Sequence, residues 1–142
     1  MTTTVLITGS SRGLGATIAQ TLAAQGFQVA INYHKSKDAA LDLVKSIGES
    51  QAIAIQADVT QRDEVDRLVA TATEHFGQID VVVNNALVGF KFDPNAQKAF
   101  TELSWSDYQQ QIDGTLKAAF NTTQSVAPQF INRRHGAIIN IG

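Results

Sequence analysis

The chain has 142 residues, with 11 lysines and arginines against 13 aspartates and glutamates, 44% hydrophobic residues and no cysteine. This composition is typical of one globular domain or part of one, and it excludes disulfides, cysteine nucleophiles and cysteine-based metal sites. The net charge of −2 gives no general attraction to nucleic acid or anionic lipid. With no basic targeting region and no apolar run long enough to span a bilayer, we expect a cytoplasmic protein without a membrane partner.

Short apolar runs rich in branched residues alternate with segments of helical period along the chain. The runs predict five strands, at Val5–Thr8, Gln28–Tyr33, Ala52–Ala57, Asp80–Asn84 and Ala137–Ile141. This alternation predicts an α/β fold with a Rossmann-like, doubly wound parallel sheet. No linker or repeat divides the chain, so we expect one domain over residues 1–142.

Apolar residues at spacings of three and four predict the intervening helices. One stripe holds Leu14, Ile18 and Leu22, and another holds Val65, Leu68, Val69, Ala72 and Phe76. Ser36 is expected to cap a helix that ends near Gly48. Thr60 and Asp63 resemble a capping box for a helix that ends before Gly77.

A longer helix is expected to follow Ser104 and to run close to Arg133. One side of it carries Tyr108, Ile112, Leu116, Ala119 and Phe120. Core packing is the default expectation for Trp105 and Tyr108, with burial in a subunit interface as the alternative. Residues 86–103 have no clean period.

A glycine-rich turn separates the first predicted strand from the first helix and reads Thr8-Gly9-Ser10-Ser11-Arg12-Gly13-Leu14-Gly15. Such a turn brings backbone N–H groups to a pyrophosphate, and the helix dipole favours the anion. The spacing departs from the Gly-x-Gly-x-x-Gly fingerprint, and glycines used only for packing are the alternative. Because strand, glycines and helix follow in the required order, we favour a phosphate site formed by Gly9, Ser11, Arg12, Gly13, Leu14 and Gly15.

With these residues the chain resembles the short-chain dehydrogenase/reductase family, whose Thr-Gly-x-x-x-Gly-x-Gly turn matches the one above. Further matches are Asp58-Val59 after the third strand, Asn84-Asn85-Ala86 after the fourth, and the fifth strand from Arg134 to Gly142. The resemblance implies that Asp58 accepts hydrogen bonds from the adenine amino group. It also implies that Asn84, Asn85 and Ala86 steady the sheet and line the nicotinamide ribose.

Within that family the chain is most similar to 3-oxoacyl-acyl carrier protein reductases and similar carbonyl reductases. The resemblance therefore implies hydride transfer between a nicotinamide cofactor and a small-molecule or acyl-thioester carbonyl, by a homo-oligomer. Leu87 replaces a family glycine. Asp113 stands where relatives usually carry an Asn whose backbone helps to hold a water of the proton relay, and it is our catalytic candidate.

The family's catalytic Tyr-x-x-x-Lys must lie on one helix face. Tyr33 and Lys37 have the spacing of this motif. However, Tyr33 lies at a predicted strand end and Lys37 at a predicted helix start, so we reject them as a catalytic pair. We expect Tyr33 beside the adenosine site or in solvent. Because the chain stops at a central strand, we also expect it to lack a C-terminal part that carries the family's Ser and Tyr-x-x-x-Lys.

The residue at the end of the second strand indicates which cofactor binds. NAD sites commonly place an acid there, which accepts bonds from the ribose hydroxyls and repels a 2′-phosphate, but this chain has Asn32. Arg12, Lys35 and Lys37 can supply cations for that phosphate, so NADP is favoured over NAD. The alternative is that these cations are ordinary surface charges.

The remaining candidate residues give little support for a further binding or catalytic site. His34, His75 and His135 show no metal-ligand spacing, so no metal site is expected. The basic run from Arg133 to His135 fits a solvated helix end rather than a nucleic-acid site. The leading hypothesis is an NADP-dependent carbonyl reductase. The alternatives are a non-catalytic NAD(P)-binding sensor or interaction module, which Leu87 and Asp113 would fit, and another nucleotide-binding doubly wound domain.

Overall fold

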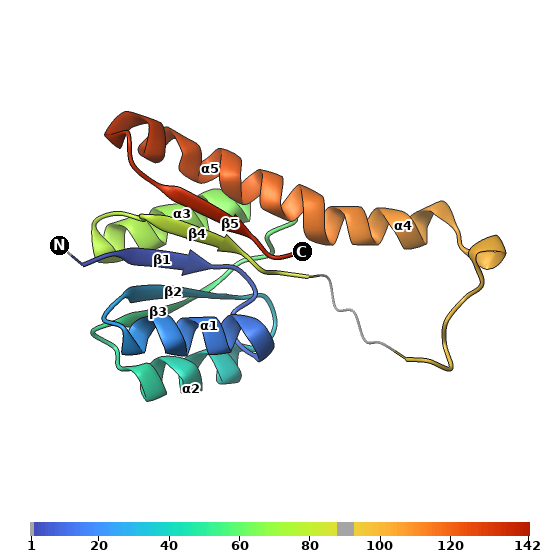
Figure 1. Cartoon of the computed structure of the whole chain (residues 1–142), viewed down its shortest axis with the longest axis horizontal. Helices are drawn as coiled ribbons and strands as arrows, with labels where there is room; N and C mark the ends of the chain where they lie inside the picture. The colour runs from blue at the N-terminus through green and yellow to red at the C-terminus, as the bar shows by residue number, and fades with distance from the viewer. Residues whose placement is uncertain (1, 88–92) are drawn as a thin grey trace.

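The computed structural model describes residues 2–87 and 93–142 and has a five-stranded parallel sheet at its centre (Figure 1). The strands are β1 (Thr4–Ile7), β2 (Gln28–Tyr33), β3 (Ala52–Gln56), β4 (Val81–Asn84) and β5 (Ala137–Asn140), in the order β3-β2-β1-β4-β5. All neighbouring strands pair in parallel, which confirms the predicted Rossmann-like sheet. The strand order reverses between β1 and β4, and open α/β sheets bind ligands outside the carboxyl ends of their strands at such a point.

Five α-helices connect or follow the strands. They are α1 (Gly13–Ala24), α2 (Lys37–Ile47), α3 (Arg62–Phe76), α4 (Trp105–Ile112) and α5 (Ala118–Arg133). A 3₁₀ turn, η1 (Phe100–Glu102), precedes α4, and a π-helical turn, η2 (Asp113–Lys117), joins α4 to α5. In the part of the chain that the structure describes, no helix is both long enough and apolar enough to cross a membrane.

Each face of the sheet is covered by its own pair of helices (Figure 1). On one face α1 and α2 pack on residues such as Val29 and Ile31, and on the other α3 and α5 pack on residues such as Leu6 and Val82. Tyr33 lies in the first of these cores with only 8% of its surface exposed. Of the two placements expected for Tyr33, the solvent one is wrong, because β2 extends through it and its ring packs in the core with α1 and α2, while the placement beside the adenosine site stays a prediction.

The predicted helix ends at Gly48 and Gly77 are confirmed, but neither predicted side-chain cap forms at the start of α2 or α3. Gly48 and Gly77 terminate α2 and α3 with positive φ angles of 115° and 89°. Ser36 precedes α2 as expected, although its side chain makes no capping hydrogen bond. Thr60 does not cap α3, because the residue before this helix is Gln61 and the Thr60 N–H and hydroxyl both donate to Asp58.

The expected long helix from Ser104 to Arg133 consists of α4, η2 and α5, which together we term the rod. Ser104 starts it as predicted, with its Oγ accepting from the Asp107 N–H at 3.3 Å and its own N–H donating to Asp107 Oδ2 at 2.8 Å. Core packing of Trp105 and Tyr108 was the wrong expectation, because they are 69% and 42% exposed. In Figure 1, α4 extends beyond the ends of the strands, where it has no sheet to cover.

The opposite end of the rod is tied to the sheet by an ion pair. The Arg133 guanidinium donates to Asp80 Oδ1 at 3.2 Å and also bonds the Ile79 carbonyl. The Asp80 side chain is 5% exposed, and its Oδ2 accepts from the Thr4 N–H at 2.8 Å. Arg133 is therefore a partly buried anchor rather than the solvated helix end expected from the sequence.

Candidate functional site

The turn between β1 and α1 requires glycine at two positions because other backbone passes close by. A Cβ added to Gly9, whose φ is +59°, would lie 2.8 Å from the Ala86 Cα. A Cβ added to Gly15 would lie 2.6 Å from Asn85 Nδ2 and 2.7 Å from the Gly9 carbonyl oxygen. Gly13, with φ of +60°, has open space around its missing Cβ. The turn is therefore crowded on the protein side and open where a ligand would approach.

Buried polar side chains hold the backbone of the turn in place through hydrogen bonds. Asn32 Oδ1 accepts from the Gly9 N–H at 3.0 Å, and Asn32 Nδ2 donates to the Ala57 carbonyl at 3.1 Å. Ser10 Oγ donates to the Ile7 carbonyl at 2.7 Å and accepts from the Asn32 N–H at 3.1 Å. Asn32 is only 2% exposed and its amide bonds the backbone of the turn, so a contact between Asn32 and the cofactor stays a prediction. Sequence reasoning missed Ser10, whose signal was a small hydroxyl beside the first glycine.

Among the residues that the structure describes, no side chain caps the first turn of α1, so its N–H groups point to where an anion could bind. Arg12 precedes the helix and neither its side chain nor an acidic residue caps the first turn. Arg12 and Leu14 are exposed, and Ser11 is partly exposed. Backbone N–H groups at a helix start attract phosphate, and the helix dipole adds to this attraction. The turn thus fits the pyrophosphate of a dinucleotide without any change of side chain.

The end of β4 is bonded to the end of β1 through Thr8. Thr8 Oγ1 accepts from the Asn85 and Ala86 N–H groups, each at 3.0 Å. Asn85 Nδ2 donates to the Thr8 and Gly9 carbonyls, each at 3.1 Å. The residues predicted to steady the sheet are therefore brought together with the glycine turn.

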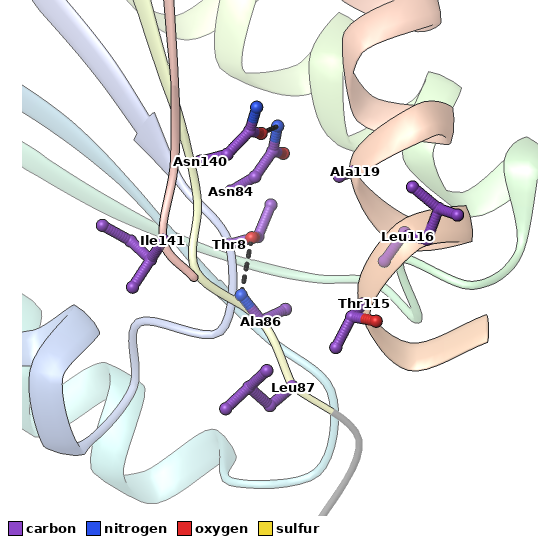
Figure 2. A pocket seen from close by; sticks show the side chains of 10 residues that line it. Thr8, Asn84, Ala86, Leu87, Thr115, Leu116, Ala119, Asn140 and Ile141 are labelled. Carbon is purple, nitrogen blue, oxygen red and sulfur yellow. Dashed lines mark hydrogen bonds between the residues drawn. The ribbon is translucent and has the colours of Figure 1, made fainter. Parts of the chain in front are cut away.

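A cavity of about 320 Å³ opens at the carboxyl ends of β1, β4 and β5, against the start of α5 (Figure 2). Thr8, Asn84 and Asn140 form its polar wall, and Leu87, Leu116 and Ile141 are among its apolar residues. Asn84 Nδ2 donates to Asn140 Oδ1 at 2.9 Å, and the buried Asn84 Oδ1 has no partner among the residues that the structure describes. The cavity therefore combines polar and apolar lining residues.

The π-helical turn η2 contributes residues of the rod to this cavity. Thr115 and Leu116 line it, whereas Asp113 does not, and the Asp113 Oδ1 instead accepts from Gln109 Nε2 at 2.9 Å along the rod. The Asp113 side chain therefore does not line the cavity, and the relay role suggested for the backbone at this position stays a prediction. The Thr115 side chain reaches the cavity wall while its Oγ1 donates to the Gln111 carbonyl at 2.5 Å.

Asp58 lies just beyond β3, at the same edge of the sheet. Its Oδ1 accepts from the Thr60 N–H at 3.0 Å and from the Thr60 hydroxyl at 2.7 Å, while its Oδ2 lies 3.9 Å from His34 Nε2. Burial opposes ionisation of Asp58, but the bonds from Thr60 and the nearby imidazole outweigh it and lower the pKa of this carboxyl. Only Oδ2 is left for a ligand.

Val59 can contribute to a ligand site only through its backbone. Its side chain is 7% exposed and packs in the core formed with α3 and α5. Its carbonyl already accepts from Asn121 Nδ2 at 3.1 Å.

Comparisons of this chain with known proteins agree on one family. The model of the short chain dehydrogenase family matches residues 3–142. The chain is 43% identical over 143 residues to the 3-oxoacyl-[acyl-carrier-protein] reductase FabG of Staphylococcus epidermidis, covering 99% of this chain and 56% of that protein. It is 38% identical over 138 residues to a 3-oxoacyl-[acyl-carrier-protein] reductase of Synechocystis, covering 96% and 53%. A solved short-chain dehydrogenase from Streptomyces avermitilis matches with a TM-score of 0.85 at 28% identity, covering 100% and 49%.

The chain thus spans about half the length of the curated relatives it matches.

Proposed function

Because the chain belongs to the short-chain dehydrogenase/reductase family, we propose that it is the cofactor-binding part of an NADP-dependent carbonyl reductase. The observation that carries this proposal is the turn before α1, where crowded glycines sit behind a helix start that no side chain caps. The cofactor, when bound, supplies the hydride, and the residues of this chain bind and orient it.

Each predicted cofactor-binding residue has a role in the proposal. The backbone from Gly9 to Gly15 holds the pyrophosphate, with Ser11, Gly13 and Leu14 at the helix start. Arg12 binds the 2′-phosphate, and Asp58 accepts from the adenine amino group through Oδ2. Asn84, Asn85 and Ala86 line the nicotinamide ribose side, next to the cavity. Asn32 acts indirectly by holding the turn in place, and Val59 acts indirectly by holding the end of β3 in place.

We infer that the substrate is a small-molecule carbonyl such as a 3-oxoacyl thioester. The relatives named above support this substrate class, and the cavity supports it by pairing a polar wall with apolar residues. The serine and the Tyr-x-x-x-Lys that the family uses for proton transfer are proposed to follow Gly142. We also propose self-association, which the exposed apolar residues of the rod support.

The cofactor proposal is tested by Arg12→Ala in the full-length protein. Charge-assisted hydrogen bonds contribute about 1.5–3 kcal/mol each, so NADPH binding should weaken roughly ten- to a hundredfold while NADH binding changes little. Calorimetric titration with both cofactors measures this difference, and Arg134→Ala, which removes an exposed arginine at the end of α5, is the matched control. An equal loss for both cofactors would show that Arg12 does not bind the 2′-phosphate.

A further inference from the structure

Leu87, three residues beyond β4, is a large apolar side chain at an exposed position. It is 65% exposed and also lines the cavity at the carboxyl ends of β1, β4 and β5 (Figure 2). A lone exposed leucine is ordinary on a protein surface, whereas an apolar side chain that lines a concave pocket is typical of a ligand-binding site. The surroundings of Leu87 therefore decide what it does.

The backbone that leads to Leu87 is fixed against the glycine turn. The Asn85 and Ala86 N–H groups both donate to Thr8 Oγ1, each at 3.0 Å. The Ala86 Cα lies so close to Gly9 that a Cβ added there would approach it to 2.8 Å. The residue before Leu87 cannot move without disturbing the turn, so the Leu87 side chain starts from a fixed point beside the cavity.

The rod supplies a second large apolar side chain to the same cavity. Leu116 of η2 lines it and is 69% exposed. Because Leu87 and Leu116 both line the cavity and are both more than half exposed, they border its opening. The volume of about 320 Å³ lies at the lower end of the range of about 300–1,000 Å³ that small-molecule pockets span. The opening is thus suited to the apolar part of a small ligand.

Several polar side chains that line the cavity already have partners in this chain. Asn84 Nδ2 donates to Asn140 Oδ1 at 2.9 Å, and the Thr115 hydroxyl donates to the Gln111 carbonyl at 2.5 Å. Thr8 Oγ1 accepts the two N–H groups described above. Since these groups bond to one another, a ligand at the opening gains binding free energy mainly by removing apolar surface from water.

We propose that Leu87 is a specificity-determining residue, which contacts the alkyl chain of the acyl group and makes the protein prefer acyl chains that extend to the cavity opening over shorter ones. Each methylene buried against an apolar side chain tightens binding about fourfold. This inference rests on the proposed carbonyl reductase function and adds the part of the substrate that this chain selects.

The experiment measures the dissociation constants of the saturated butanoyl and octanoyl thioesters of N-acetylcysteamine for the full-length protein, by calorimetric titration with and without NADP. These thioesters lack the 3-oxo group, so they report binding without turnover. The natural protein should bind the octanoyl thioester at least about tenfold more tightly than the butanoyl one. In Leu87→Ala this preference should fall about five- to tenfold, whereas Leu87→Met, which keeps a long apolar side chain, should retain it.

Two further measurements separate a contact with the ligand from a general effect on the protein. Leu41→Ala removes an exposed leucine of α2, which does not line the cavity, and should leave the preference unchanged. The ratio of kcat/KM for the 3-oxooctanoyl thioester to that for the 3-oxobutanoyl thioester, with NADPH, should fall in Leu87→Ala by the same factor as the binding preference.

The outcomes also separate this inference from the proposed function. An unchanged preference in Leu87→Ala, or an equal loss of affinity for both saturated thioesters, would overturn the role of Leu87. Failure of both saturated thioesters to bind the natural protein would overturn it as well. If the thioesters bind with a preference that depends on Leu87 but no 3-oxoacyl thioester is reduced, the reductase proposal fails and the contact with Leu87 stands.

Discussion

The glycine turn and the rod meet at the same edge of the sheet, but they are held in different ways. Around the turn, the side chains of Thr8, Ser10, Asn32 and Asn85 all bond neighbouring backbone. On the rod, Trp105, Leu116 and Phe120 are each more than half exposed. The turn is thus fixed by contacts within this chain, whereas the rod carries apolar side chains that the described residues leave exposed.

The largest effect is expected from Gly15→Ala in the turn. The added Cβ would lie within 2.8 Å of Asn85 Nδ2, the Gly9 carbonyl and Ser10 Cα. The last two are backbone atoms, and moving them costs free energy. We expect the free energy of unfolding to fall by about 3 kcal/mol or more, the upper end of overpacking costs, as measured by urea denaturation of the full-length protein.

Gly26→Ala is the control for Gly15→Ala. Gly26 has a φ of +89° and open space around its missing Cβ, so the substitution adds backbone strain without a collision. Its cost should be about 1–2 kcal/mol. Equal losses for both variants would mean that the turn relaxes and that its crowding is not decisive.

A smaller effect, on association rather than stability, is expected from Phe120→Asp on the rod. Phe120 is 58% exposed, so the free energy of unfolding of the monomer should change by only about 0.5 kcal/mol. A charge placed in a buried apolar contact between copies should dissociate the oligomer, which light scattering after size-exclusion chromatography would detect. Gln110→Asp, at an exposed position of α4, should leave the oligomer intact. An unchanged mass for Phe120→Asp would show that this surface is not the interface.

The smallest effect concerns the start of the rod. Bonds from the Ser104 N–H and hydroxyl, together with Lys98, lower the pKa of Asp107 to about 2. A lowered pKa means that the ionised cap stabilises the helix above the ordinary aspartate pKa of about 3.9 and is lost as the pH falls toward about 2. Amide exchange of the first turn of α4 should therefore accelerate between about pH 4 and 2, and Asp107→Asn should abolish this pH dependence.

Sequence patterns predicted the elements that depend on local chemistry. The five strands, Gly48 and Gly77 as helix ends and Ser104 as a helix start are all confirmed, because periodicity and capping act over a few residues. The roles of Asn32 and Thr60 could not be predicted, since each depends on which neighbouring strand supplies the bonding partner. The π-helical turn that begins at Asp113 could not be predicted, because no sequence pattern indicated it.

The π-helical turn also determines the direction in which the apolar side of the rod points. Tyr108, Ile112, Leu116 and Phe120 are spaced by four, and in a straight α-helix, at about 100° per residue, such a series winds by about 40° at each step, or about 120° in all. A π turn accommodates one extra residue and so takes back about 100° of that rotation. With η2 in the middle, Phe120 returns to within about 20° of the direction of Tyr108, so the π turn undoes most of the winding along this series.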